Sequence, residues 1–275
     1  MEKIQNMIKY ITTLSEEISH QNYVFLNSKY KSQFEIVDYS KKDQLDYKKE
    51  DIYFINCLVS SDMANHFIQL KKQQKINKLI IHNSGNVDFV KIETLNQFDL
   101  IYYETLYTYR NSHLRNHVNN LRAFGVNTDI FRCKNLTKKY DYIWVGSIND
   151  HLKRFTKISE LAQKGSKILM IGNIYTPEDK FKLDNMISQG FEISVKSRCN
   201  LDELSYYYNI SKCLLLTQPL YGGGERSLLE AKYCGLEIKI LDNEKLSELH
   251  KEDKKFDIEY YTKQIDKGLD KIINK

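Results

Sequence analysis

Three consecutive glycines, Gly222–Gly224, follow the apolar run Cys213–Thr217 and precede a helical pattern that begins at Glu225 or just after it. Glycine lets a backbone approach a ligand closely, and the free amides at the start of a helix bind phosphate well. Arg226 and Ser227, in the first helical turn, could add hydrogen bonds to a diphosphate. The segment favours a phosphate-binding loop, and the alternative is a glycine turn before an ordinary surface helix.

Glu230 lies one turn further along the same helical pattern. Its carboxylate can accept two hydrogen bonds there from the diol of a ribose. A pair of cations follows another apolar run, because Tyr142–Gly146 leads through a short loop to Lys153 and Arg154. Both side chains could neutralise a pyrophosphate. The alternative for this pair is a solvated basic face.

Short apolar runs rich in β-branched residues alternate with helical patterns along most of the chain. In the first half the expected strands are Tyr23–Leu26, Phe34–Val37, Ile52–Leu58, Lys78–His82 and Leu100–Tyr103. The expected helices there are an N-terminal amphipathic one with Ile4, Met7, Ile8, Ile11 and Leu14 on one stripe, Met63–Gln73, and one around His113–Phe124. In the second half the expected strands are Tyr142–Gly146, Lys167–Gly172, Phe191–Ser194, Cys213–Thr217 and Glu237–Leu241, and the expected helices are Leu152–Gln163, Pro177–Ser188, Leu201–Ile210, Glu225–Cys234 and Ile258–Ile273.

This alternation predicts an α/β protein whose parallel sheets are covered by helices on both faces. Two runs of the pattern, divided near residue 130, predict two doubly wound, Rossmann-like domains with a cleft between them. We expect one domain over 1–128, a second over 129–257 and a last helix within 258–275. Ligands of such sheets bind beyond the carboxyl ends of the strands. The loops of interest are therefore His82–Asn86, Gly146–Asp150, Gly172–Thr176 and Gln218–Gly224.

Four segments, in order, carry a resemblance to a known family over about residues 123–245. They are Gly125–Phe131, which ends in an aspartate and a phenylalanine, Val145-Gly146 followed by Lys153, the helix with Leu204–Tyr208, and Leu228-Leu-Glu-Ala231 leading to Gly235. Together they resemble the donor-binding domain of GT-B glycosyltransferases, in the retaining, nucleotide-sugar-dependent (family 4-like, "glycosyl transferases group 1") group. The resemblance implies a GT-B fold, with 1–128 as a small acceptor-side domain, 129–257 as the donor domain and 258–275 packing back towards the first domain.

The resemblance also implies roles for individual residues. Glu230 would hold the ribose of the donor nucleotide, and Lys153 and Arg154 would face its diphosphate. Backbone amides of Gly223, Gly224 and Glu225 would contact the phosphates or the sugar. The Gly146-Ser147 turn, together with Arg226 and Ser227, would complete the donor site.

Two positions depart from the family pattern. Gly222 stands where the family usually has a glutamate that faces the donor sugar, eight positions before Glu230. Glu225 lies nearby and could substitute for that glutamate, although it is out of register. Ser147 stands where an arginine often follows the glycine of the first donor-domain strand. These changes bear on the identity of the sugar and on the diphosphate contacts.

The sequence contains no Asp-x-Asp motif, which glycosyltransferases with a metal-held diphosphate need. We therefore expect a metal-independent site without a cofactor, in which basic residues and a helix terminus replace the cation. His82 ends an expected strand, and the resemblance to GT-B enzymes makes it a candidate to touch the donor sugar. The alternative for His82 is a structural histidine. Arg110 and Arg115 lie in the acid-free segment 105–128 and are weak candidates for contact with an anionic acceptor. His113 and His117 in that segment have metal-pair spacing, but no third ligand is evident.

Composition narrows the class of protein further. The 275 residues are 41% hydrophobic and 28% charged, which is enough for a real core, and two prolines and 11 glycines exclude a collagen-like chain. Five cysteines without a Cys-x-x-Cys pair favour a reduced setting over a disulfide or zinc scaffold. No secretory signal and no apolar stretch of 18 residues is present, so we expect a cytoplasmic protein, in the host cytoplasm if it is viral.

Together with these observations, the resemblance implies an enzyme that moves a hexose or pentose from a nucleotide diphosphate sugar to an acceptor hydroxyl, with retention of configuration. The acceptor is a saccharide or surface polymer or, if the chain is phage-encoded, a hydroxymethylated DNA base flipped towards the site. The alternative is a non-catalytic GT-B-like protein that binds a nucleotide or serves in an assembly. A nucleotide-sugar epimerase or dehydrogenase is disfavoured, because no Gly-x-Gly-x-x-Gly occurs near the N-terminus.

Overall fold

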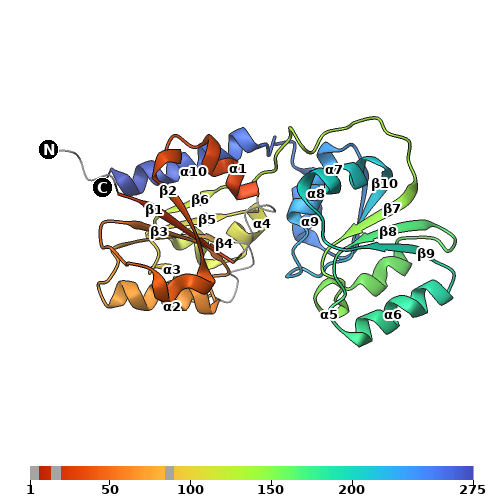
Figure 1. The fold of residues 1–275 in the computed structure, drawn as a ribbon, viewed down its shortest axis with the longest axis horizontal. Coiled ribbons are helices and arrows are strands. Elements are labelled where there is room, and N and C mark those ends of the chain that lie inside the picture. The colour runs from red at the N-terminus through yellow and green to blue at the C-terminus, as the bar shows by residue number, and fades with distance from the viewer. Residues whose placement is uncertain (1–5, 14–19, 84–89, 275) are drawn as a thin grey trace. The chain divides into compact units, whose positions relative to one another are not determined.

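The computed structural model describes residues 6–13, 20–83 and 90–274. The chain forms two compact units. The first combines Met1–Gly125 with Lys255–Lys275, and the second is Val126–Lys254. Each unit contains one wholly parallel sheet with helices on both of its faces (Figure 1). This α/β architecture confirms the predicted fold class.

The first unit is built on a six-stranded parallel sheet in the order β2-β1-β3-β4-β5-β6. Its strands are β1 (Ile8–Thr12), β2 (Phe34–Asp38), β3 (Ile52–Cys57), β4 (Lys78–Asn83), β5 (Leu100–Tyr103) and β6 (Asn120–Arg122). Its helices are α1 (His20–Asn27), α2 (Asp62–Lys72), α3 (Ile92–Leu95), α4 (Leu106–Arg110) and α10 (Ile258–Ile273). Alternate residues of β3 point to opposite faces, so that Phe54 packs with the core under α1 and α10 and Tyr53 with the core under α2.

The second unit is built on a five-stranded parallel sheet in the order β11-β10-β7-β8-β9. Its strands are β7 (Tyr140–Val145), β8 (Lys167–Ile171), β9 (Glu192–Lys196), β10 (Ser211–Leu216) and β11 (Glu237–Ile240). Its helices are α5 (Asp150–Lys153), α6 (Pro177–Ser188), α7 (Leu201–Asn209), α8 (Glu225–Tyr233) and α9 (Glu244–Lys251). α5 and α6 lie on one face, and α7, α8 and α9 lie on the other (Figure 1). Trp144, at the centre of the first of these cores, is fully buried.

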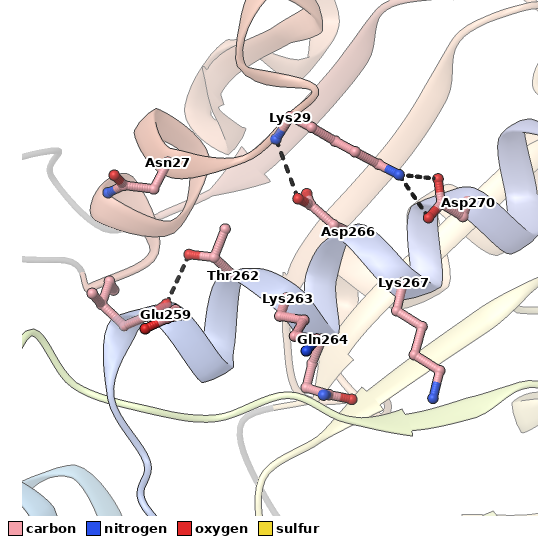
Figure 2. Close-up of a pocket in the computed structure, with 10 residues that line it drawn as sticks. Asn27, Lys29, Glu259, Thr262, Lys263, Gln264, Asp266, Lys267 and Asp270 are labelled. Atoms are coloured by element: carbon pink, nitrogen blue, oxygen red, sulfur yellow. Dashed lines mark hydrogen bonds and ion pairs between the residues drawn. The ribbon is translucent and has the colours of Figure 1, made fainter.

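The last helix, α10, belongs to the first unit although the second unit separates it in sequence. Tyr102 donates a hydrogen bond from its hydroxyl to Ile265 O at 2.6 Å, and Gly268 faces the same ring. A Cβ on Gly268 would lie 2.0 Å from the Tyr102 hydroxyl oxygen, so this close approach requires glycine. α10 also pairs with the end of α1, where Lys29 binds Asp266 and Asp270 beside a surface groove of about 680 Å³ (Figure 2).

Three expected elements of the first half are wrong. The predicted N-terminal helix is the strand β1, which pairs with β2 and β3 on its two sides, and Ile4 and Leu14 of the proposed stripe lie outside the described residues. Tyr23–Leu26 lies in α1 and is not a strand. The predicted helix around His113–Phe124 is a 3₁₀ turn over His113–Asn116 followed by β6. Short apolar runs cannot distinguish a buried strand from a helix, because both can be apolar without a clear period.

Among the residues that the structure describes, no helix combines the length and the hydropathy that crossing a membrane would need.

Candidate functional site

The glycine loop of the second unit joins β10 to α8 by a sharp backbone turn. Gly223 has φ +76° and Gly224 has φ +103°, both in the left-handed region that favours glycine. Gly224 is the N-cap residue of α8, so no side chain caps the first turn that contains Glu225, Arg226 and Ser227. The amides of this turn therefore remain directed out of the helix end, where the helix dipole favours an anion. Arg226 and Ser227 are both half-buried there.

Lys153 reaches the glycine loop from the neighbouring strand connection. β7 and β10 are adjacent in the sheet, so the loops that follow them meet at the same edge. The Lys153 ammonium donates a hydrogen bond to Gly222 O, and a Cβ on Gly223 would lie 3.3 Å from Lys153 Nζ. Thr217 fixes the lysine backbone, since its hydroxyl donates to Lys153 O at 3.0 Å. The two sequence segments singled out for chemistry are thus brought together.

Burial lowers the pKa of Lys153, with the nearby charge of Lys245 acting in the same direction and the carboxylate of Glu225 opposing it. A half-buried ammonium with a lowered pKa is poorly solvated. An anion that approached this lysine would replace the missing water and stabilise the charge.

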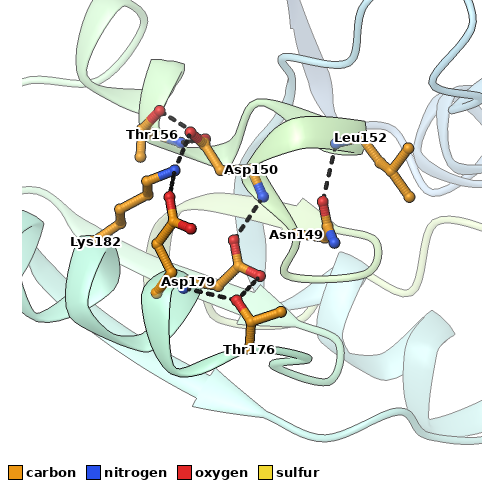
Figure 3. Close-up of polar contacts among 8 residues, drawn as sticks. Asn149, Asp150, Leu152, Thr156, Thr176, Asp179 and Lys182 are labelled. Atoms are coloured by element: carbon orange, nitrogen blue, oxygen red, sulfur yellow. Dashed lines mark hydrogen bonds and ion pairs between the residues drawn. The ribbon is translucent and has the colours of Figure 1, made fainter.

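A network of polar contacts holds the loop that carries Lys153 (Figure 3). Asp150 accepts hydrogen bonds from Thr156 N at 3.0 Å and from the Thr156 hydroxyl at 2.7 Å, and its second oxygen lies 3.4 Å from Lys182 Nζ. Asp179 accepts from Asp150 N at 2.9 Å, which ties the loop to α6. Burial raises the pKa of Asp150, but the Thr156 hydrogen bonds and the Lys182 charge outweigh it, so that this pKa is lowered overall.

Arg154 follows in the left-handed conformation, with φ 52° and ψ 40°, and ends α5. The Asp150 network closes around this turn and thereby sets the direction in which Lys153 leaves the backbone. Arg154 itself is half-buried.

Glu225 and Lys245 form an ion pair beside the glycine loop. Their side chains are only 7% and 2% exposed. Lys245 comes from the first turn of α9, and the sequence analysis missed it because a lysine at the start of an amphipathic helix looks like an ordinary surface residue. The carboxylate of Glu225, which was considered as a substitute for the missing family glutamate, is thus engaged by a buried cation.

Glu230 is buried in α8, with 4% of its surface exposed. The hydroxyl of Tyr208, on α7, donates a hydrogen bond to Glu230 Oε2 at 3.0 Å. Burial and the carboxylate of Glu230 raise the pKa of Tyr208 well above its usual value, and a contact with Ser227 opposes the shift. Ser227, Tyr208 and Glu230 therefore form one cluster. Tyr208 lies in Leu204–Tyr208, one of the four segments that carry the family resemblance, but its contact with Glu230 was not predicted.

Gly146 directly follows β7 at the same edge of the sheet, and its amide donates to Ile171 O at 3.0 Å. A Cβ on Gly172 would lie 1.8 Å from Gly146 O, so the loops after β7 and β8 are in close contact. Ser147 follows, half-buried, and its carbonyl accepts from Asn149 N at 2.8 Å. The Gly146-Ser147 turn thus lies beside the loop that positions Lys153.

The remaining candidates belong to the first unit. His82 is only 1% exposed, and its Nε2 lies 2.9 Å from Ala123 O and 3.3 Å from the Tyr261 hydroxyl. This placement favours the structural interpretation of His82. Residues 84–86 of its loop lie outside the described residues. Arg110 and Arg115 are exposed.

The proposed metal pair is not supported by the local structure. His117 Nδ1 lies 2.7 Å from Asn119 O and its Nε2 lies 3.1 Å from Phe98 O, so backbone carbonyls occupy both ring nitrogens. His113 is in a 3₁₀ turn and does not share an α-helical face with His117. Within the part of the chain that the structure describes, no group of three or more His, Cys, Asp or Glu side chains could hold a metal ion.

No protein-family model matches this chain, and the search of curated proteins finds no match either. Solved structures do resemble it. HepE from Anabaena, in complex with UDP and glucose, has a TM-score of 0.66 at 10% identity, over 97% of this chain and 100% of that chain. A glycosyltransferase from Rickettsia africae has a TM-score of 0.61 at 13% identity, over 98% of this chain and 89% of that chain. Sucrose-phosphate synthase from Thermosynechococcus elongatus has a TM-score of 0.66 at 11% identity, over 96% of this chain and 90% of that chain. At these identities the likeness is one of fold.

Proposed function

The chain has the GT-B fold, which it shares with these solved structures, and on that premise we propose that it is a glycosyltransferase that uses a nucleotide diphosphate sugar. The observation that carries the proposal lies within the second unit. A buried glutamate, an uncapped helix start with two left-handed glycines, and a poorly solvated lysine meet at the carboxyl edge of one parallel sheet. HepE, of the same fold, was crystallised with UDP and glucose, which supports a donor of this class.

In the proposed donor site, the diphosphate lies against the start of α8. The amides of Gly223, Gly224 and Glu225 bind its oxygens, and Arg226 and Ser227 add hydrogen bonds from the first turn. Glu230 accepts hydrogen bonds from the ribose diol with its carboxylate oxygens, one of which also accepts from the Tyr208 hydroxyl. The Gly146-Ser147 turn contacts the donor from the loop after β7.

The proposed reaction depends on stabilising the leaving group. As the bond between the sugar and the diphosphate breaks, negative charge grows on the departing phosphate, and Lys153, Arg154 and Arg226 stabilise it in place of a metal ion. The acceptor hydroxyl attacks from the side that the diphosphate leaves, which retains the configuration at the sugar carbon. No side-chain nucleophile is then needed, and we do not assign His82 a part in the chemistry.

The acceptor is proposed as a saccharide or surface polymer, with a hydroxymethylated DNA base as the second candidate. The exposed Arg110 and Arg115 are the residues that would meet an anionic acceptor. An acceptor screen with oligosaccharides and with hydroxymethylated DNA tests the two classes. Salt dependence distinguishes them further, because binding to DNA weakens steeply with ionic strength.

Thermal stabilisation by a panel of nucleoside diphosphates and their sugars, with and without EDTA, tests the donor site. A ligand that binds the folded state raises the melting temperature by mass action. We expect one nucleotide to give a clear shift that EDTA leaves unchanged and that Glu230→Ala abolishes. Glu237→Ala is the matched control, because Glu237 is an exposed glutamate at the amino end of β11, whereas the proposed donor site lies at the carboxyl ends of the strands.

Turnover separates the enzyme from its alternative. Release of the nucleoside diphosphate from its sugar, and transfer to an acceptor, are measured by chromatography. Binding without any turnover across the acceptor panel favours the non-catalytic GT-B-like nucleotide-binding or assembly protein. Absence of a thermal shift with every nucleotide, on a folded sample, contradicts the donor site itself.

A further inference from the structure

Three charged side chains that are far apart in the sequence lie beside the glycine loop. They are Lys153, Glu225 and Lys245, which span 93 positions. Glu225 Oε1 is paired with Lys245, and Glu225 Oε2 lies 3.7 Å from the position that a Cβ on Gly223 would take. Lys153 Nζ lies 3.3 Å from that same position. One buried carboxylate is thus paired with one ammonium group and lies near a second.

We propose that Lys245 is a positioning residue of the donor site, which neutralises Glu225 so that the charge of Lys153 remains available to the donor diphosphate. The inference rests on the proposed function, since it concerns the same site. Lys245 is not expected to touch the donor, because its ammonium is buried behind Glu225 with 2% of its side chain exposed.

The charge count at the loop explains why this lysine matters. Among Lys153, Glu225 and Lys245, two cations and one anion leave one net positive charge. Without Lys245, Glu225 and Lys153 neutralise each other, and the carboxylate at the start of α8 repels an incoming diphosphate. Charges in a buried environment are weakly screened, so the change acts on ligand affinity.

Asn243, two positions before Lys245, holds this lysine in place. Asn243 caps α9 by accepting a hydrogen bond from Leu246 N at 3.0 Å. Its amide donates to Gln218 O at 3.0 Å and to Pro219 O at 3.2 Å, at the beginning of the glycine loop. The same asparagine therefore holds both the loop and the helix turn that presents Lys245.

The test measures the affinity for UDP and for uncharged uridine in Lys245→Met, Lys245→Arg and the double variant Glu225→Gln/Lys245→Met. We expect K245M to weaken UDP about tenfold or more, since a unit charge is lost within the buried cluster, while uridine binding is unchanged. K245R keeps the charge and retains the affinity. The double variant regains UDP affinity to within about threefold of the unmodified protein, because Lys153 is again uncompensated.

Lys251→Met is the matched control, because Lys251 is an exposed lysine on the same helix. If K245M binds UDP as the unmodified protein does, the inference is overturned and the donor site stands. A double variant as weak as K245M also overturns it, because neutralisation would then not be the reason. If K245M fails to fold, the double variant, which leaves no buried carboxylate without its lysine partner, decides by the same threefold criterion. If the unmodified protein binds another nucleoside diphosphate of the panel and not UDP, that diphosphate and its nucleoside replace UDP and uridine in the same comparison. If it binds none of them, the proposed donor site fails, and the inference fails with it.

Discussion

The hydroxyl of Tyr208 donates a hydrogen bond to the buried carboxylate of Glu230 at 3.0 Å. Tyr208→Phe removes this hydrogen bond and keeps the ring in its core. We expect a loss of about 1 kcal/mol in the free energy of unfolding and a several-fold weaker affinity for the nucleotide, because the carboxylate loses its orientation. Chemical denaturation and calorimetric titration measure the two effects. Tyr206→Phe, at an exposed tyrosine of the same helix, should change neither.

The pH dependence of nucleotide binding should report on Lys153. Burial lowers the pKa of this lysine, so its ammonium loses the proton at a lower pH than an ordinary lysine does. Since the charged form binds the diphosphate, affinity should fall as pH rises through that lowered pKa. Titrations above about pH 7.5, where the diphosphate is ionised, measure the fall. In Lys153→Arg it should disappear, because arginine stays charged, and an unchanged profile would contradict the assignment.

At the scale of elements, the short helix α5 is held less by its own four residues than by the Asp150 network. Asp150→Asn keeps the size of the side chain but removes the charge that pairs with Lys182 and weakens the acceptance of two hydrogen bonds from Thr156. We expect about 1–2 kcal/mol of lost stability and a raised KM for the donor with a smaller effect on kcat.

The same network predicts acid sensitivity. Because the pKa of Asp150 is lowered in the folded protein, its contribution to stability is present above the usual aspartate pKa and is lost as pH falls through the lowered value. The difference in melting temperature between the protein and Asp150→Asn should therefore shrink in acid. Asp184→Asn serves as the control, since Asp184 is half-exposed on α6 and pairs only with the exposed Lys180 among the contacts described.

Sequence periodicity predicted the strands of the second unit closely, because each is a short apolar run bounded by a loop signal. The expected helix Leu152–Gln163 was wrong, since α5 ends at Lys153 and a 3₁₀ helix over Phe155–Glu160 follows the left-handed Arg154, and α9 was not predicted. The expected helix Glu225–Cys234 and α8 begin at the same residue, and the expected strand Lys167–Gly172 corresponds to β8. The helix expected in place of β1 was wrong, because an inner strand is buried on both faces and shows no alternation of apolar and polar residues that would identify it. The glycine loop and Lys153 were predicted because they lie in family-like segments. Lys245 was not, because its meeting with Glu225 depends on the turn between β11 and α9.

At the scale of the whole molecule, each unit has its own sheet and its own cores, and the chain returns to the first unit only through its last segment. Tyr261, Ile265, Leu269 and Ile272 of α10 are buried in the core that lies under α1. The core of the first unit therefore needs α10, which follows the second unit in the sequence, whereas every strand of the second unit lies within one continuous segment. A perturbation of α10 should consequently affect one unit only.

Gly268→Ala tests this directly. The added Cβ would lie 2.0 Å from the Tyr102 hydroxyl oxygen and 2.7 Å from Leu100 Cδ2, so α10 must move away from the sheet. We expect a loss of about 1–3 kcal/mol in the stability of the first unit, because overpacking a close contact forces the backbone to shift. Hydrogen exchange should accelerate in β4, β5 and α10 and stay unchanged in β7 and β10. Lys267→Ala, at an exposed neighbour on α10, should leave both units as they are. Equal acceleration in both sheets would show that the two units unfold as one cooperative structure, and would contradict the prediction that each unit has its own free energy of unfolding.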